Sequence, residues 1–213
     1  MSRLSSGDHG RLGSVTDIDD TVEMTPEDLA RWRSARTLAD LGELIAQFLE
    51  GRMQMSPTHC APPDSETTEL IPVLAAANRA GFVTHQSQPG VPLDEDGSAQ
   101  RANVSGYAGP EAFARLMAAT SGADLIITAA RALDDSEERR FGPFFAITID
   151  EGEEFTWDGI AVSRSIISSD YGHECHPAVI ADLAAAWQVT LIDPVWGRND
   201  VLWPVLEAFA ART

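Results

Sequence analysis

Cysteine and basic residues are both scarce in this sequence. Its 213 residues include two cysteines, Cys60 and Cys175, so no disulfide framework holds the fold. Fifteen Lys and Arg residues stand against 33 Asp and Glu residues, which leaves a formal net charge of -18. This charge repels phosphate backbones and anionic membrane surfaces, and so argues against nucleic-acid and membrane partners. It would favour a cationic small molecule, although a solvated acidic surface that maintains solubility is the simpler explanation.

Long apolar segments and targeting signals are also missing. No apolar run approaches the ~20 residues that are needed to span a bilayer. The N-terminus is rich in Ser, Gly and charge and lacks the apolar core of a signal peptide, so we expect a disordered tail over residues 1–16. Residues 17–213 contain no internal repeat and no linker long enough to divide them. These features predict a single cytoplasmic domain.

The sequence lacks the motifs of the commonest enzyme classes. It has no phosphate-binding glycine loop with lysine, no dinucleotide fingerprint after a strand and no nucleophile elbow. Close carboxylates occur at residues 94–96 and 151–154, but in so acidic a chain we interpret them as exposed loop residues. Enzymatic activity stays open, and a binding domain is favoured over an enzyme.

Three potential metal ligands, His173, Cys175 and His176, lie within four residues. Zinc accepts imidazole and thiolate groups, but structural zinc sites usually show paired, well-spaced ligands. Cys175 and His176 are adjacent, which makes ligation by both awkward. His176 also precedes Pro177 at an expected helix start, where a capping residue is ordinary. We therefore expect no bound metal.

Helices and strands alternate, which predicts an α/β domain with a mixed β-sheet core flanked by helices. An amphipathic helix is expected from Leu38 to Leu49. A second should begin near residues 66–68, because Pro72 is tolerated only in or just after a first turn, and it should end at Gly81. Further expected features are strands over 82–87, 100–107, 124–130, 144–149 and 189–192, a hairpin return through 155–157 and 160–167, and a final helix capped by Asn199.

The strand over 82–87 carries two hydroxyl side chains, Thr84 and Ser87, toward its end. Strands of α/β folds end in ligand crevices, so hydroxyls at such a position are candidate binding groups. Periodicity alone gives a location and no particular ligand.

The segment Gly81-Phe-Val-Thr-His-Gln-Ser-Gln-Pro89 resembles a known signature, Gly-(Ile/Tyr)-Leu-Thr-Ile-Asn-Ser-Gln-Pro. That signature belongs to the C-terminal regulatory domain of eukaryotic methylenetetrahydrofolate reductase. Glu66-Thr67 falls where that family has a Glu-Thr pair, and Phe155-Thr-Trp-Asp-Gly159 resembles its Val-Thr-Trp-Gly. Three later segments, at 164–167, 189–193 and 202–203, are similar to its Arg-Glu-Ile-Ile, Val-Asn-Leu-Val-Asp and Leu-Trp. The matches keep their order over about residues 27 to 210.

In that family the domain binds S-adenosylmethionine and inhibits a catalytic barrel. The resemblance implies a similar fold and five ligand contacts, namely Glu66, Thr67, Thr84, Ser87 and Thr156. A carboxylate suits the sulfonium and ammonium of the ligand, and hydroxyls suit its carboxylate, ribose or adenine edges. The barrel is absent, so reductase activity is not implied. The expected function is a stand-alone sensor or regulatory domain for S-adenosylmethionine or S-adenosylhomocysteine, with a regulated protein as its partner.

Two other functions stay open. A small enzyme acting on an adenosyl or other small-molecule substrate would use Glu66, His85 or the cluster at 173–176 as acid–base groups or as a metal site. A protein–protein interaction module would keep the fold without the ligand. The resemblance is interrupted at His85 and Gln86, which replace an apolar residue and an asparagine, and near Asp170, where the family has a further threonine.

Overall fold

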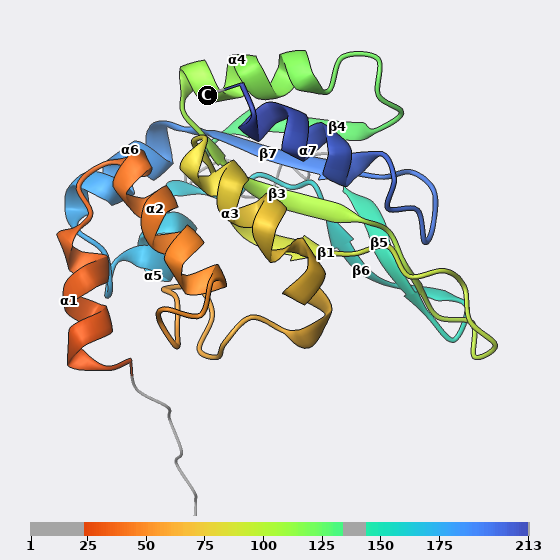
Figure 1. Cartoon of the computed structure of the whole chain (residues 1–213), viewed down its shortest axis with the longest axis horizontal. Helices are drawn as coiled ribbons and strands as arrows, with labels where there is room; N and C mark the ends of the chain where they lie inside the picture. The colour runs from red at the N-terminus through yellow and green to blue at the C-terminus, as the bar shows by residue number, and fades with distance from the viewer. Residues whose placement is uncertain (1–23, 134–143, 213) are drawn as a thin grey trace, which may run out of the picture.

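Two antiparallel sheets form the centre of the computed structural model, which describes residues 24–133 and 144–212 (Figure 1). The main sheet has the order β1 (Phe82–Gln88), β3 (Asn103–Ala108), β7 (Trp187–Ile192) and β4 (Ile126–Arg131). The smaller sheet has the order β2 (Ala99–Gln100), β5 (Phe145–Asp150) and β6 (Glu153–Asp158). Every strand pairing in these sheets is antiparallel. The α/β class is confirmed, whereas the expected mixed sheet is wrong. The tail expected over residues 1–16 lies outside the described residues.

Helices flank the main sheet (Figure 1). Two of them, α3 (Ile71–Arg79) and α4 (Pro110–Ala119), pack against strands of this sheet, and both also pack against α7 (Leu202–Ala210). The other four, α1 (Pro26–Ser34), α2 (Leu38–Leu49), α5 (Arg164–Tyr171) and α6 (Pro177–Ala185), gather at the left of the view. In the described part of the chain, none of the helices has the length and apolar character to cross a membrane.

The first helices begin where their capping residues predict. The Thr25 hydroxyl accepts a hydrogen bond of 3.1 Å from the Asp28 amide at the start of α1. Thr37 and Asp40 form a reciprocal capping box at the start of α2, in which each side chain accepts from the other residue's backbone amide. The hydrophobic positions of α2 then face the core, which confirms the helix expected over this segment.

The segment before β1 is more tightly wound than expected. A 3₁₀ helix, η1 (Ser65–Leu70), precedes α3, and Pro72 lies in the first turn of α3. Pro72 has no amide hydrogen to donate, so it fits a helix start and not an interior position. Glu66 and Thr67 therefore lie on η1, ahead of the α-helix that was expected to contain them.

The strand expected over 100–107 is divided between the two sheets. The Arg101 amide donates to the Ile147 carbonyl of β5 at 2.8 Å, and the Asp193 amide donates to the Ala102 carbonyl at 2.8 Å. The chain thus passes from one sheet to the other at Arg101 and Ala102. The Gln88 amide group fixes this junction, because it donates to the carbonyls of Arg101 and Ile147, both at 3.0 Å.

Three other expectations are wrong. Residues 160–167 do not continue the hairpin, because Ser163 caps α5 and its hydroxyl accepts from the Ile166 amide. Asn199 does not cap α7, which begins at Leu202; its side chain instead pairs with the backbone of Gly90 through two hydrogen bonds of 2.8 Å. The strand expected to be buried over 124–130 is the edge strand β4, whose alternate residues are exposed.

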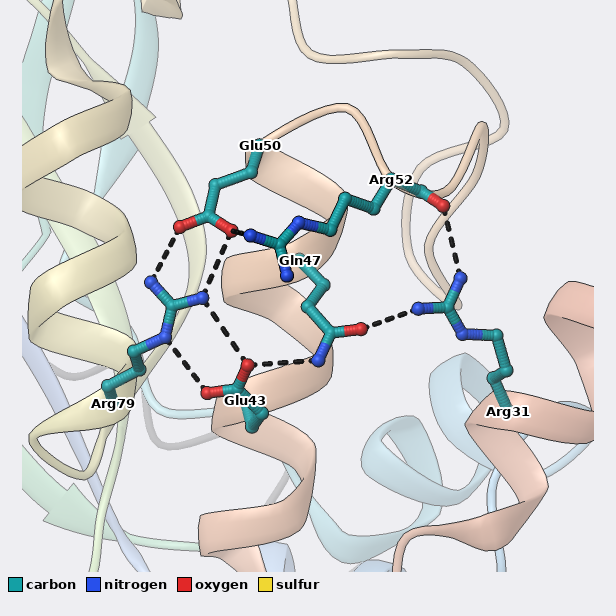
Figure 2. Close-up of polar contacts among 6 residues, drawn as sticks. All are labelled: Arg31, Glu43, Gln47, Glu50, Arg52 and Arg79. Carbon is teal, nitrogen blue, oxygen red and sulfur yellow. Dashed lines mark hydrogen bonds and ion pairs between the residues drawn. The ribbon is translucent and has the colours of Figure 1, made fainter.

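A network of charged side chains joins the first three helices (Figure 2). Arg79 of α3 donates to Glu43 at 2.9 Å and to Glu50 at 2.6 Å. Gln47 donates to Glu43 at 2.9 Å and accepts from Arg31 of α1 at 2.5 Å. The hydrogen bonds from Arg79 and then from Gln47 hold the pKa of Glu43 below its ordinary value of 4.5, and Arg79 lowers the pKa of Glu50 in the same way. The two carboxylates in turn raise the pKa of Arg79.

Replacing Arg79 with methionine should lower the free energy of unfolding by about 1 kcal/mol near pH 7, since partly exposed ion pairs are screened by water. Folding lowers the pKa of Glu43 and Glu50, so the contribution is complete above pH 4.5 and is lost as the pH falls through the pKa values of the folded protein. Urea unfolding of Arg79→Met and wild type across this pH range measures the difference. Arg212→Met is the control, because this arginine has no ion pair within the described residues. A difference that does not shrink in acid would contradict the prediction.

Candidate ligand-binding site

A hollow of about 260 Å³ lies beside β1, and we call it the β1 hollow. Its apolar wall includes Ile45, Phe48 and Leu49 of α2. Its polar lining includes Thr67 of η1, Thr84 and Ser87 of β1, and Ser56, Thr58, His59 and Asp64 from the connecting loop and turn. Three of the five predicted ligand contacts, on two elements, therefore line one hollow.

A bulge in β1 directs consecutive residues into this hollow. Thr84 pairs with Gly106 and Gln86 with Ser105, so His85 is an extra residue without an opposite partner in β3. In a regular strand alternate side chains point to opposite faces. Here the four residues 84–87 all line the hollow, because the bulge changes the direction of the side chains that follow it.

The hydroxyl of Thr84 is held in place by Asn78, which is fully buried on α3. The Asn78 side-chain nitrogen donates to the Thr84 hydroxyl at 2.7 Å and to the Leu74 carbonyl at 2.9 Å. The Asn78 side-chain oxygen accepts from the Thr84 amide at 3.0 Å. Within the described residues β1 is an edge strand that pairs only with β3. The Asn78 side chain therefore takes the place of a second neighbouring strand as the acceptor for the Thr84 amide. The Thr84 hydroxyl proton stays available for a ligand.

Two further hollows adjoin the first, and Gln86 lines all three. The Asp170 hollow, of about 420 Å³, is lined by Pro57, Thr58, Cys60, His85, Gln86, Tyr107, Val162, Asp170 and Tyr171. The Thr156 hollow, of about 520 Å³, lies between the sheets and includes Gln86, Gln88, Asp94, Ser98, Gln100, Thr148, Asp150 and Thr156. Thr156 is thus separated from the other predicted contacts, and Glu66 is an exposed residue of η1 that lines none of the three.

The three hollows are acidic. Their walls carry four carboxylates, from Asp64, Asp94, Asp150 and Asp170. No arginine is among the described residues that line them, and the whole sequence contains no lysine. A cationic ligand group would therefore meet favourable charge here, whereas a phosphate would be repelled.

His85 lies between the β1 hollow and the Asp170 hollow. The residue has solvent-accessible surface, but many protein atoms surround its ring. The resulting desolvation lowers the pKa of His85 below its ordinary value of 6.5. The charges of Asp158 and Asp170 oppose the lowering. The imidazole is therefore neutral at pH 7 and can accept or donate one hydrogen bond.

The histidine and cysteine cluster has structural roles. The His176 ring accepts from the Ala178 amide at 3.2 Å and caps α6, as its position before Pro177 predicted. Cys175 is buried, and this burial raises the pKa of its thiol to about 12. Across residues 24–133 and 144–212, no group of three or more His, Cys, Asp or Glu side chains could hold a metal ion.

The sequence alone does not identify several residues of the site. Asn78 has the pattern of an ordinary polar residue in a helix, and Asp170 is noticed only because it departs from the family that the chain resembles. Their positions depend on contacts between separate elements. Ile45, Phe48 and Leu49 were expected as a hydrophobic helix face, and periodicity does not show that part of this face borders a hollow.

The fold and the site define an α/β domain with acidic, ligand-sized hollows around a bulged edge strand. This chain belongs to the family described as a domain of unknown function, DUF6919, whose model matches residues 27–212. The matched span contains both sheets and every residue that lines the three hollows. The chain matches no curated protein.

Proposed function

We propose that this protein is a stand-alone sensor or regulatory domain that binds S-adenosylmethionine or S-adenosylhomocysteine. The observation that carries the proposal is the meeting of Thr67, Thr84 and Ser87 in the β1 hollow. The resemblance to the methylenetetrahydrofolate reductase regulatory domain implies that all three contact an adenosyl ligand. Thr84 and Ser87 belong to one strand, whereas Thr67 comes from a separate element, η1, so its meeting with them depends on the fold.

The chemistry of the β1 hollow suits such a ligand. Its apolar wall, from Ile45, Phe48 and Leu49, offers a surface for a purine ring, and the hydroxyls opposite offer partners for polar edges. Its volume of about 260 Å³ is near the lower end of the ~300–1,000 Å³ typical of small-molecule sites. A ligand that extended into the adjoining Asp170 hollow would gain space and a carboxylate.

Replacing Ser87 with alanine should weaken binding of both adenosyl compounds about tenfold, the effect of losing one hydrogen bond to a ligand. Isothermal titration of wild type and variant measures this, and mass analysis of the recovered ligand should show it unchanged. Ser121→Ala is the matched control, because Ser121 is exposed in the turn after α4 and lines none of the three hollows. Absence of binding by the folded wild type would overturn the proposal.

A second candidate is an enzyme that acts on an adenosyl or other small-molecule substrate, and His85 favours it. A neutral imidazole between two hollows, within the fields of Asp158 and Asp170, can accept a proton from a bound molecule. With an adenosyl substrate, this candidate requires that the recovered ligand be altered and that turnover be lost in His85→Ala. Unaltered ligand in the titration experiment decides against an adenosyl substrate.

Exposed aromatic side chains on the β5–β6 hairpin support a regulatory role. Phe155 and Trp157 are 63% and 45% exposed, and Phe144 packs edge-on against Trp157 with ring centroids 6.5 Å apart. Exposed apolar groups of this size are typical of interaction surfaces. Phe155 also lines the Thr156 hollow, so a regulated protein bound here would lie next to the candidate site.

A further inference from the structure

The Asp170 hollow contains a carboxylate that is not among the predicted ligand contacts. Asp170 is the one carboxylate among its described lining residues, and no arginine shares the lining. Within the described part of the chain Asp170 has no ion pair. Its charge is therefore available to a molecule that enters the hollow.

Two tyrosines give the wall of this hollow a buried, neutral side. Tyr107 and Tyr171 are 2% and 1% exposed, and burial raises the pKa of both phenols, so they stay uncharged. Their ring centroids are 6.2 Å apart, and the His85 ring lies 5.3 Å from that of Tyr107. Asp170 itself is exposed, but it shares the hollow with these buried rings, and a charge interacts more strongly across a less polar medium than in bulk water.

The Asp170 hollow adjoins the β1 hollow. Thr58, His85 and Gln86 line both and are exposed, so a ligand that extends past them would reach from one hollow into the other. The apolar wall of the β1 hollow suits the adenosine half, which leaves the sulfur and the amino-acid half for the Asp170 hollow. S-adenosylmethionine carries a positive sulfonium at this sulfur, whereas S-adenosylhomocysteine carries a neutral thioether.

We propose that Asp170 is a specificity-determining residue whose carboxylate makes the site prefer a cationic sulfonium ligand over the neutral thioether. This inference rests on the proposed function, because it concerns the ligand of the same site. The two compounds share adenosine, ammonium and carboxylate groups, and they differ in the methyl group on sulfur and the positive charge that it confers. The change in the ratio of their dissociation constants between wild type and Asp170→Asn therefore isolates the interaction of Asp170 with that charge.

Titration of wild type, Asp170→Asn and Asp170→Glu with both compounds tests the inference. Wild type should bind S-adenosylmethionine more tightly, and Asp170→Asn should lose about fivefold in that affinity while S-adenosylhomocysteine affinity changes less than twofold. Asp170→Glu should restore part of the preference, and higher salt should reduce it in wild type. Asp182→Asn, which removes an exposed carboxylate of α6 away from the hollows, is the control for net charge.

The outcomes separate the two proposals. If both compounds bind and Asp170→Asn keeps the wild-type ratio, the role of Asp170 is overturned and the proposed function stands. If folded wild type binds neither compound, the proposed function fails and this inference fails with it. A thermal melt of each variant, matched to wild type, establishes that the change lies in binding and not in folding.

Discussion

Replacing Asn78 with alanine is expected to lower the free energy of unfolding by about 3 kcal/mol. The variant leaves the buried Thr84 amide without its acceptor and the Leu74 carbonyl without one donor, and it opens a cavity in the core. A buried polar group without a partner costs ~1–3 kcal/mol, and the lost packing adds to this. Urea denaturation measures the change directly.

Thr84→Val is the matched variant for this prediction. It removes the hydroxyl that accepts from Asn78 but keeps the shape of the side chain and the amide hydrogen bond. Because the Asn78 nitrogen can still donate to the Leu74 carbonyl, the expected loss is only about 1 kcal/mol. If Asn78→Ala were no more destabilising than Thr84→Val, the Asn78 side chain would not be securing the edge of β1.

Replacing Gly42 with alanine is expected to destabilise the fold by about 2 kcal/mol, although alanine is the better helix former. A methyl group at this position would lie 2.4 Å from the backbone oxygen of Asn78, so α2 and α3 would have to separate. Overpacking of this kind costs ~1–3 kcal/mol or more, whereas the gain in helix propensity is about 1 kcal/mol. Thermal and urea unfolding should both show the loss.

Gly109→Ala provides the comparison. The nearest atom to an added methyl group there is a Leu38 side-chain carbon at 4.0 Å, so no clash opposes the change. Gly109 is the N-cap of α4, where alanine is less favoured, and the expected loss is below about 1 kcal/mol. If Gly42→Ala and Gly109→Ala lost equal stability, the close contact between Gly42 of α2 and the Asn78 backbone of α3 would not be what makes a methyl group unfavourable at position 42.

Both of these sites belong to the structure that supports the β1 hollow. Gly42 allows α2 to approach α3 closely, and α2 supplies the apolar wall. Asn78 of α3 then holds Thr84 of β1 on the opposite side. A close helix pair and a buried amide thus set the spacing between the two walls, so substitutions outside the hollow are expected to change its shape.

Part of the candidate site followed from the sequence because it depends on local order. Thr84 and Ser87 were placed on a strand by the glycine that precedes it and by its apolar start, and that strand is present as β1. The bulge at His85 was not predictable, because it depends on how β1 pairs with β3. The positions of Glu66 and Thr156 relative to the β1 hollow were not predictable either. Both lie on regular elements, but neither lines this hollow.

The sequence by itself determined where the first helices begin, the position of β1 and the acidic character of the surface. Each of these depends on side chains and backbone within a few residues of one another, or on composition alone. Only the tertiary structure decided the antiparallel direction of the strands, the crossing between sheets at Arg101, and the meeting of His85 with Asp170. Those features join segments that are tens of residues apart, and such contacts form only when the whole core packs.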